Sequence, residues 1–208
     1  MNILGKEMPQ NIENIYRQIK SDCGRAVVSY IPGENNSVQQ TGLNSFRIII
    51  NINLPDDYFW EIFLHENVHI IQTCCGYRNV NDSTPLMHLL TDAIMDIDVH
   101  RRLQEYGYIY SDYGDKKLLF DIMKLTSRIQ ENHDIWYYLV ISIALYRIAY
   151  DEEMGNVLAA GFSKDNQVFK EMYTKFIQLL DKHSETNCIE NAILYNESIK
   201  LFTLPRHQ

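Results

Sequence analysis

The sequence has few cysteines, no long hydrophobic run and no excess of positive charge. Its 208 residues include four cysteines, two of them adjacent and none in a Cys-x-x-Cys pair: Cys23, Cys74, Cys75 and Cys188. This pattern excludes a disulfide framework and a cysteine-based zinc site. The most apolar stretch, residues 135–150, contains Ser142 and Arg147. It is too short for a membrane span, so we expect a buried helix there and no membrane partner.

Basic residues are also scarce. The chain has 19 Lys and Arg against 27 Asp and Glu, which gives a formal net charge of −8 and a pI near 5.3. A general nucleic-acid binder needs a basic face, so we expect no nucleic-acid partner. Residues 1–20 have no long apolar core of the kind found in secretory signals. We therefore expect a cytoplasmic protein, whose oligomeric state the sequence does not indicate.

Hydrophobic residues make up 46% of the chain and aromatic residues 12%, which is enough for one sizeable core. We predict strands over residues 25–31 and 45–52, antiparallel to each other and joined by a polar connection over residues 32–42. The remaining periodic segments predict helices. Their expected ranges are 11–19, 86–105, 116–129, 134–150, 166–180 and 188–202, with residues 155–163 as a separating segment.

The predicted fold class is therefore α+β and mostly helical. A small antiparallel sheet packs on one central helix, and the C-terminal half is helical. We expect a single domain over residues 1–208, with a core over 1–106 and a helical extension over 107–208 that packs on it.

The central helix contains the sequence His65-Glu66-Asn67-Val68-His69. Residues four apart share one face of a helix, so His65 and His69 present two imidazoles to the same point. Two such imidazoles bind a zinc ion at about 2.0–2.1 Å each. Apolar residues recur around the motif at spacings of three and four, which predicts a buried helix: Trp60, Phe63, Leu64, Val68 and Ile71.

Glu66 follows the first histidine and is poorly placed to be a metal ligand itself. A carboxylate beside a bound zinc is where a general base for water belongs. The motif therefore predicts a Zn²⁺ cofactor, with His65 and His69 as ligands and Glu66 as the catalytic base.

A catalytic zinc needs a third protein ligand. We expect it from the helix over residues 86–105, with Asp92 as the preferred ligand and His88 as the alternative. Asp96 lies four residues after Asp92, and one such acid can bind the metal while the next orients a ligating histidine. Asp98 points away from that face, and we expect it to form surface pairs with the neighbouring arginines.

These residues resemble a gluzincin-type zinc metallopeptidase, most closely the compact ImmA/IrrE-like metallopeptidase domain. The similarity covers the strand over 46–52, the motif His65 to His69, and Asp92-Ala93-Ile94-Met95-Asp96. It implies that the two histidines bind zinc, that Glu66 is the base and that Asp96 is the orienting acid. The family usually has Glu at the third-ligand position, where this chain has the shorter Asp92.

The expected function is zinc-dependent hydrolysis of peptide bonds in a peptide or protein substrate. The alternative is a non-catalytic binding or regulatory protein on a degenerate zincin scaffold. An oxyanion-stabilising side chain is also expected, and an extended substrate could add to the edge of the strand over 45–52. The candidates for the oxyanion donor are Tyr106, Tyr108, Tyr110, Tyr113 and His133.

Overall fold

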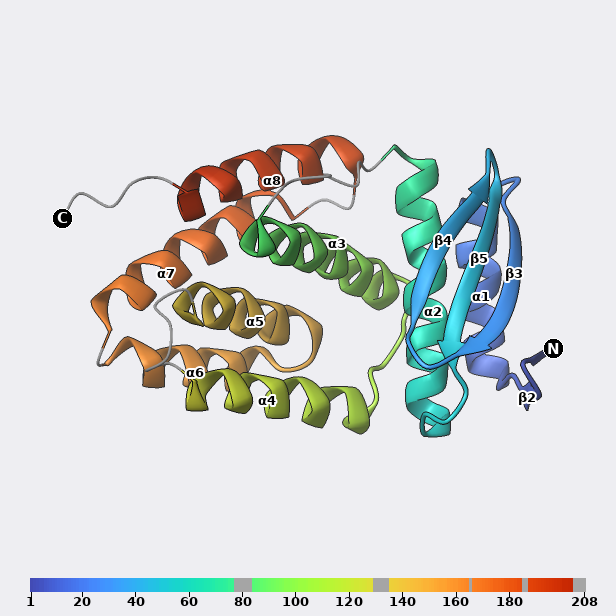
Figure 1. Ribbon diagram of the computed structural model, residues 1–208, viewed down its shortest axis with the longest axis horizontal. Coiled ribbons are helices and arrows are strands. Elements are labelled where there is room, and N and C mark those ends of the chain that lie inside the picture. The colour runs from blue at the N-terminus through green and yellow to red at the C-terminus, as the bar shows by residue number, and fades with distance from the viewer. Residues whose placement is uncertain (77–83, 129–134, 165, 185–186, 204–208) are drawn as a thin grey trace. The chain divides into compact units, whose positions relative to one another are not determined.

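The computed structural model describes residues 1–76, 84–128, 135–164, 166–184 and 187–203 (Figure 1). The chain divides into two compact units. The first comprises residues 1–78 and 99–114, and the second comprises residues 79–98 and 115–208. The dividing point lies inside one continuous helix, α3 (Pro85–Glu105), so this helix contributes to both units.

The first unit contains two small sheets and two long helices. Its elements are β1 (Asn2–Ile3), β2 (Lys6–Glu7), α1 (Gln10–Asp22), β3 (Val27–Gly33), β4 (Ser37–Gly42), β5 (Ser45–Asn51) and α2 (Asp56–Cys74). β1 and β2 form an antiparallel pair. The larger sheet has the strand order β3-β5-β4.

The larger sheet corrects the predicted strand pairing. β3 and β5 are parallel, because the polar connection between them contains a further strand, β4, which pairs antiparallel with β5. The strand β4 was not predicted because its sequence is mostly polar, and both faces of an exposed edge strand can be polar. β5 is the central strand and is paired on both sides, so an extended substrate cannot add to its edge as predicted.

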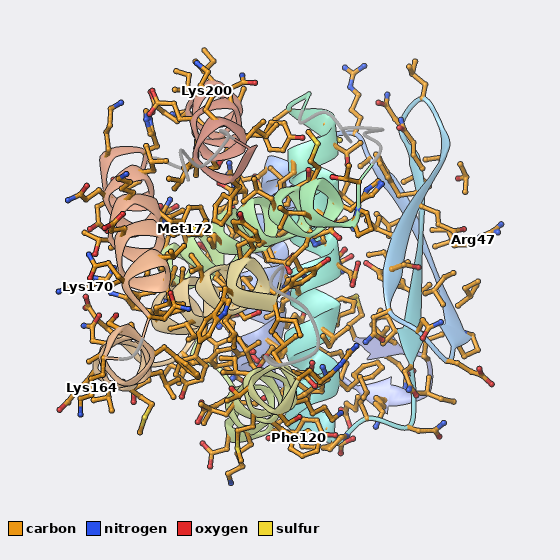
Figure 2. The ribbon with its side chains drawn as sticks, turned by 60° about the vertical axis from the view of Figure 1, so that its left-hand side comes forward. Arg47, Phe120, Lys164, Lys170, Met172 and Lys200 are labelled. Atoms are coloured by element: carbon orange, nitrogen blue, oxygen red, sulfur yellow. The ribbon has the colours of Figure 1, made fainter. Side chains whose placement is uncertain are left out.

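One face of the sheet packs on the helices. Along β5 the side chains of Phe46, Ile48 and Ile50 are buried, while Arg47 between them points outward (Figure 2). This alternation is expected for a strand with one buried face. The buried side chains form one cluster with apolar residues of α1 and α2, and this cluster fixes the central helix against the sheet.

The second unit is helical. It contains the first part of α3, most of α4 (Asp112–Ser127), and α5 (Ile135–Ala149), α6 (Glu152–Ser163), α7 (Gln167–Lys182) and α8 (Cys188–Thr203). The helix α5 is the most apolar of these, with eight buried residues. Lys164 follows α6 and precedes α7. On α7, Lys170 points outward, whereas Met172 is buried (Figure 2).

Helix α6 was predicted as part of a separating segment, and that prediction is wrong. Asp151 caps the helix by accepting a hydrogen bond from the backbone N–H of Met154 at 2.8 Å. Gly155 lies within this helix and permits close helix packing. A Cβ at this position would lie 2.6 Å from the Cβ of Arg147 on α5.

The predicted fold class is confirmed: the chain is α+β and mostly helical, with a small sheet region followed by a helical C-terminal half. The other predicted helices are present with ends shifted by a few residues. Within the described residues, no helix has both the length and the apolar character needed to cross a membrane.

Candidate metal centre

The motif lies in the middle of α2, which is buried along most of its length. The predicted apolar positions Trp60, Phe63, Leu64, Val68 and Ile71 are all buried, as expected. The helix begins after Pro55 without a side-chain cap. Instead, Asp56 accepts a hydrogen bond from Lys6, so its carboxylate ties the start of α2 to β2.

The two histidines of the motif converge. The Nε2 atoms of His65 and His69 lie 3.0 Å apart, and the ring centroids are separated by 4.7 Å. Two imidazole nitrogens on one tetrahedral zinc, each about 2.05 Å from the metal, would lie about 3.3 Å apart. Both side chains are partly buried. Their separation therefore fits shared coordination of a metal ion with only a small adjustment.

Gln72 indicates which ring nitrogen of His69 carries a hydrogen. Its Oε1 lies 2.7 Å from Nδ1 of His69, and Gln72 is fully buried. An amide oxygen only accepts hydrogen bonds, so Nδ1 of His69 carries the hydrogen and donates it. The lone pair of the neutral ring is then on Nε2, the nitrogen that faces His65. A hydrogen bond of this kind to the far nitrogen is typical of metal-binding histidines.

Glu66 and Asn67 are both buried on α2, with exposed fractions of 7% and 2%. The side chain of Asn67 donates to the carbonyl oxygen of Phe63 at 2.7 Å and accepts from the hydroxyl of Tyr30 at 2.9 Å. The hydroxyl of Tyr16 lies 3.0 Å from that of Tyr30. This chain of hydrogen bonds joins α1, β3 and α2. Sequence analysis missed it because the partners are far apart in the chain.

Asp96 is the acidic residue that joins the two histidines. Within the described residues, His65, His69 and Asp96 each offer a ligand atom, and these atoms lie within 4.8 Å of one another. No such group in the described part of the chain includes Asp92 or His88, and both of these side chains are exposed. The assignment of Asp92 as ligand and of Asp96 as orienting acid stays a prediction.

His100 is a further residue near the motif, and the sequence places it among the possible metal ligands on α3. It is 6% exposed, and its ring centroid lies 5.7 Å from that of His65. On its other side the ring of Tyr110 is 4.7 Å away, and the Tyr110 hydroxyl donates to the backbone oxygen of His100 at 3.2 Å. The spacing Asp96-x-x-x-His100 was the available signal, since it places both residues on one face of α3.

The structure separates the candidate oxyanion donors. Tyr110 is in ring contact with His100, whereas the hydroxyl of Tyr106 donates to Asp22 and the ring of Tyr113 packs on Tyr58. Tyr108 is buried against the rings of the same cluster as Tyr110. His133 lies outside the described residues. Tyr110 is thus the candidate closest to the histidine cluster through ring contacts.

The prediction of Asp98 as a surface residue is wrong. It is 1% exposed, and it accepts a hydrogen bond from the side chain of Asn191 at 3.0 Å. A buried carboxylate needs such a donor. Asn191 is on α8, far along the sequence, so the residues around Asp98 could not predict this hydrogen bond.

Comparisons of the chain with protein-family models, with curated proteins and with solved structures gave no match.

Proposed function

We propose that the protein is a zinc-dependent peptidase in which Glu66 is the general base. The observation that carries the proposal is the convergence of His65 and His69, whose Nε2 atoms lie 3.0 Å apart while Gln72 holds the far nitrogen of His69. Two neutral imidazoles and a carboxylate are a donor set that catalytic zinc accepts. Asp96 supplies the carboxylate in this proposal.

A zinc ion bound there would polarise the scissile carbonyl and lower the pKa of a water molecule. Glu66 would take a proton from the attacking water as the water oxygen bonds to the carbonyl carbon. It then gives the proton to the amine as the carbon–nitrogen bond breaks. Tyr110 is the proposed donor to the developing oxyanion, and its single O–H would then leave the backbone oxygen of His100.

Metal content tests the first half of the proposal. The purified chain, dialysed against metal-free buffer after zinc loading, is expected to hold about one zinc per chain. His65→Ala and His69→Ala each abolish this retention. His88→Ala is the matched control, because His88 is exposed on α3. Replacement of zinc by cobalt gives a visible absorption spectrum typical of four ligands. Retention of zinc by the double histidine variant would overturn the site.

The ligand register is tested with a matched pair of acids on α3. Asp96→Asn is expected to weaken zinc binding by at least about tenfold, because an amide oxygen is a poorer ligand than a carboxylate. Asp92→Asn leaves the affinity unchanged if Asp96 is the ligand. The reverse result assigns the metal to Asp92, as the sequence predicted.

Hydrolysis is tested with the zinc-loaded chain and a mixed synthetic peptide library analysed by mass spectrometry. Glu66→Gln is expected to abolish cleavage and leave zinc content intact. Glu153→Gln, an exposed change on α6, controls for the loss of one charge. If the zinc-loaded chain cleaves no more than Glu66→Gln does, the enzyme proposal fails. The site then belongs to a binding protein stabilised by its metal.

A further inference from the structure

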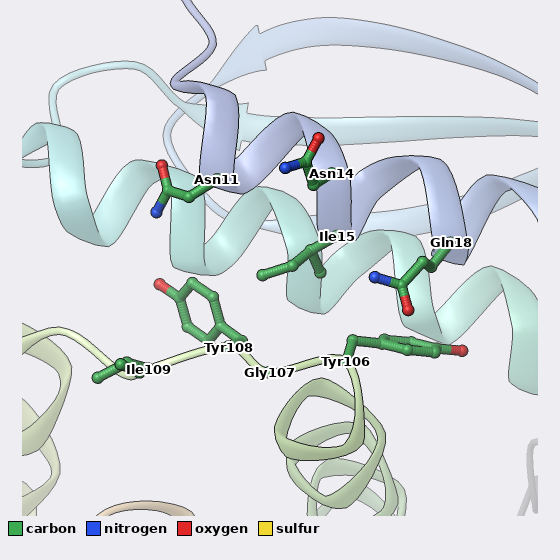
Figure 3. Close-up of a pocket in the computed structure, with 8 residues that line it drawn as sticks. All are labelled: Asn11, Asn14, Ile15, Gln18, Tyr106, Gly107, Tyr108 and Ile109. Atoms are coloured by element: carbon green, nitrogen blue, oxygen red, sulfur yellow. The ribbon is translucent and has the colours of Figure 1, made fainter.

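A groove lies between α1 and the segment over residues 106–111, within the first unit (Figure 3). Its first part has a volume of about 330 Å³. On one wall α1 contributes three exposed amide side chains, Asn11, Asn14 and Gln18. The facing wall is formed by residues 106–109. Figure 3 shows the side chain of Gln18 extending toward Tyr106.

The second part of the groove has a volume of about 440 Å³ and continues the first, because Asn11, Tyr108 and Ile109 line both. The charged residues that line it are all acidic: Glu7, Asp56 and Asp57. Lys6 pairs with Asp56. Among the described residues Glu7 and Asp57 form no ion pair, so two negative charges at this end are available to an occupant.

Tyr108 places an unused polar group in the groove. The residue is only 9% exposed, yet its hydroxyl has no hydrogen-bond partner within the described chain. Figure 3 shows the ring extending from the 106–109 segment toward α1. Burial, and then the negative charges of Glu61 and Asp57, raise the pKa of Tyr108 well above its usual value. The hydroxyl therefore stays protonated and can donate a hydrogen bond to a ligand.

Ile109 gives the groove an apolar rim. Its side chain is 89% exposed, although isoleucine is among the residues most often buried. It lines both parts of the groove, beside Tyr108. An aromatic and aliphatic wall opposite amide groups suits a ligand with both an apolar stem and a polar backbone.

We propose that this groove binds an extended peptide segment whose lysine or arginine side chain lies against Glu7 and Asp57. The amides of α1 then pair with the peptide backbone, and the Tyr108 hydroxyl donates to one of its carbonyl oxygens. Positions 11 and 18 of α1 are about 10 Å apart along the helix axis. This span matches about three residues of extended peptide. This site needs no metal, so peptide binding in the groove can be tested independently of the proposed peptidase activity.

The binding test uses three acetylated and amidated pentapeptides, Ala-Ala-Xaa-Ala-Ala, in which Xaa is lysine, norleucine or glutamate. Each is titrated into the isotope-labelled full chain at low salt, and the amide resonances are followed by NMR. The lysine peptide is expected to shift the resonances of Asn11, Gly107 and Ile109. The norleucine peptide, which has the same stem without the charge, is expected to bind about three- to tenfold more weakly.

Variants locate the interaction. Asp57→Asn combined with Glu7→Gln is expected to remove the preference for lysine over norleucine, while Glu34→Gln, an exposed change outside the groove, preserves it. Tyr108→Phe weakens all binding peptides about threefold or more by removing one donor. Tyr113→Phe is its control. Both phenylalanine variants keep their rings, and a dispersed spectrum confirms that each is folded.

Two results would overturn the proposal. One is equal affinity for the lysine, norleucine and glutamate peptides, including no shift with any of them. The other is a selective shift of groove resonances by a neutral oligosaccharide such as chitotetraose when no peptide has an effect. Binding of the lysine peptide to zinc-free His65→Ala supports the groove even if the peptidase proposal fails.

Discussion

Single residues decide whether the two histidines bind a metal, and Gln72 is the one whose effect can be isolated. Its buried oxygen accepts the Nδ1 hydrogen of His69 at 2.7 Å. Gln72→Leu is expected to weaken zinc binding about 10- to 100-fold, because the far nitrogen of a ligating histidine loses its acceptor. Competition with a chromophoric zinc chelator measures the affinity. Gln39→Leu, an exposed glutamine on β4, is the control.

Gln72→Glu separates a local effect from a general loss of structure. The glutamate keeps an oxygen acceptor for His69, so we expect zinc affinity to return to within about threefold of the unaltered chain. If the leucine and glutamate variants lose zinc equally, Gln72 acts through the packing of α2 and not through the tautomer of His69.

Residue patterns predicted part of the candidate site. His65, Glu66 and His69 could be chosen because helix periodicity alone places the two histidines on one face, and the observed 3.0 Å separation agrees with this. The burial and contacts of His100 and Asp98 could not be predicted, because the residues around them are far away in the sequence. The choice between Asp92 and Asp96 depends on the rotation of α3, which sequence spacing leaves open.

At the scale of elements, the position of α2 depends on a polar anchor that crosses the first unit. Tyr30 on β3 donates to the buried amide of Asn67, which also donates to the backbone of α2. Asn67→Leu leaves the Tyr30 hydroxyl without this acceptor, and we expect it to lower the free energy of unfolding by about 1–3 kcal/mol. Urea unfolding followed by circular dichroism measures the change.

The double variant with Tyr30→Phe tests whether the two residues act together. Removing both polar partners is expected to cost less than the sum of the single changes, because the hydrogen bond between Tyr30 and Asn67 is lost only once. Additive losses would mean that Asn67 stabilises α2 only through its bond to Phe63.

Helices were easier to predict than the sheet, for a physical reason. The burial periodicity of α2 and α5 comes from neighbours within one turn, so it is visible in a short window of sequence. β4 lies at the edge of the sheet, where its position depends on pairing with β5, and Val38 is the one large apolar residue in its sequence. A local signal remains at the start of α3, where the hydroxyl of Thr84 accepts a hydrogen bond from the N–H of Met87.

At the scale of the whole molecule, buried groups that stay neutral link folding to alkaline pH in both units. In the first unit, burial raises the pKa of Cys23 from 9.0 to about 12 and raises that of Tyr30 above its usual value of 10.0. In the second, burial and a hydrogen bond to Asp115 raise the pKa of Tyr146, and burial raises that of Tyr173. The folded chain therefore holds these protons more tightly than the unfolded chain does.

The sign of the pH dependence follows from this difference. Below pH 9 both states are protonated at these groups and the stabilisation is fully present. Above pH 9 the unfolded state loses protons first, so the free energy of unfolding falls and continues to fall toward pH 12.

We expect a loss of more than about 1 kcal/mol between pH 8 and pH 11 in urea unfolding experiments. Tyr30→Phe and Tyr146→Phe should each make the decline shallower, whereas Tyr113→Phe, at an exposed site, leaves it unchanged. An equally steep decline in all three variants would assign the alkaline instability to general charge repulsion, because the net charge of −8 grows more negative as tyrosines ionise.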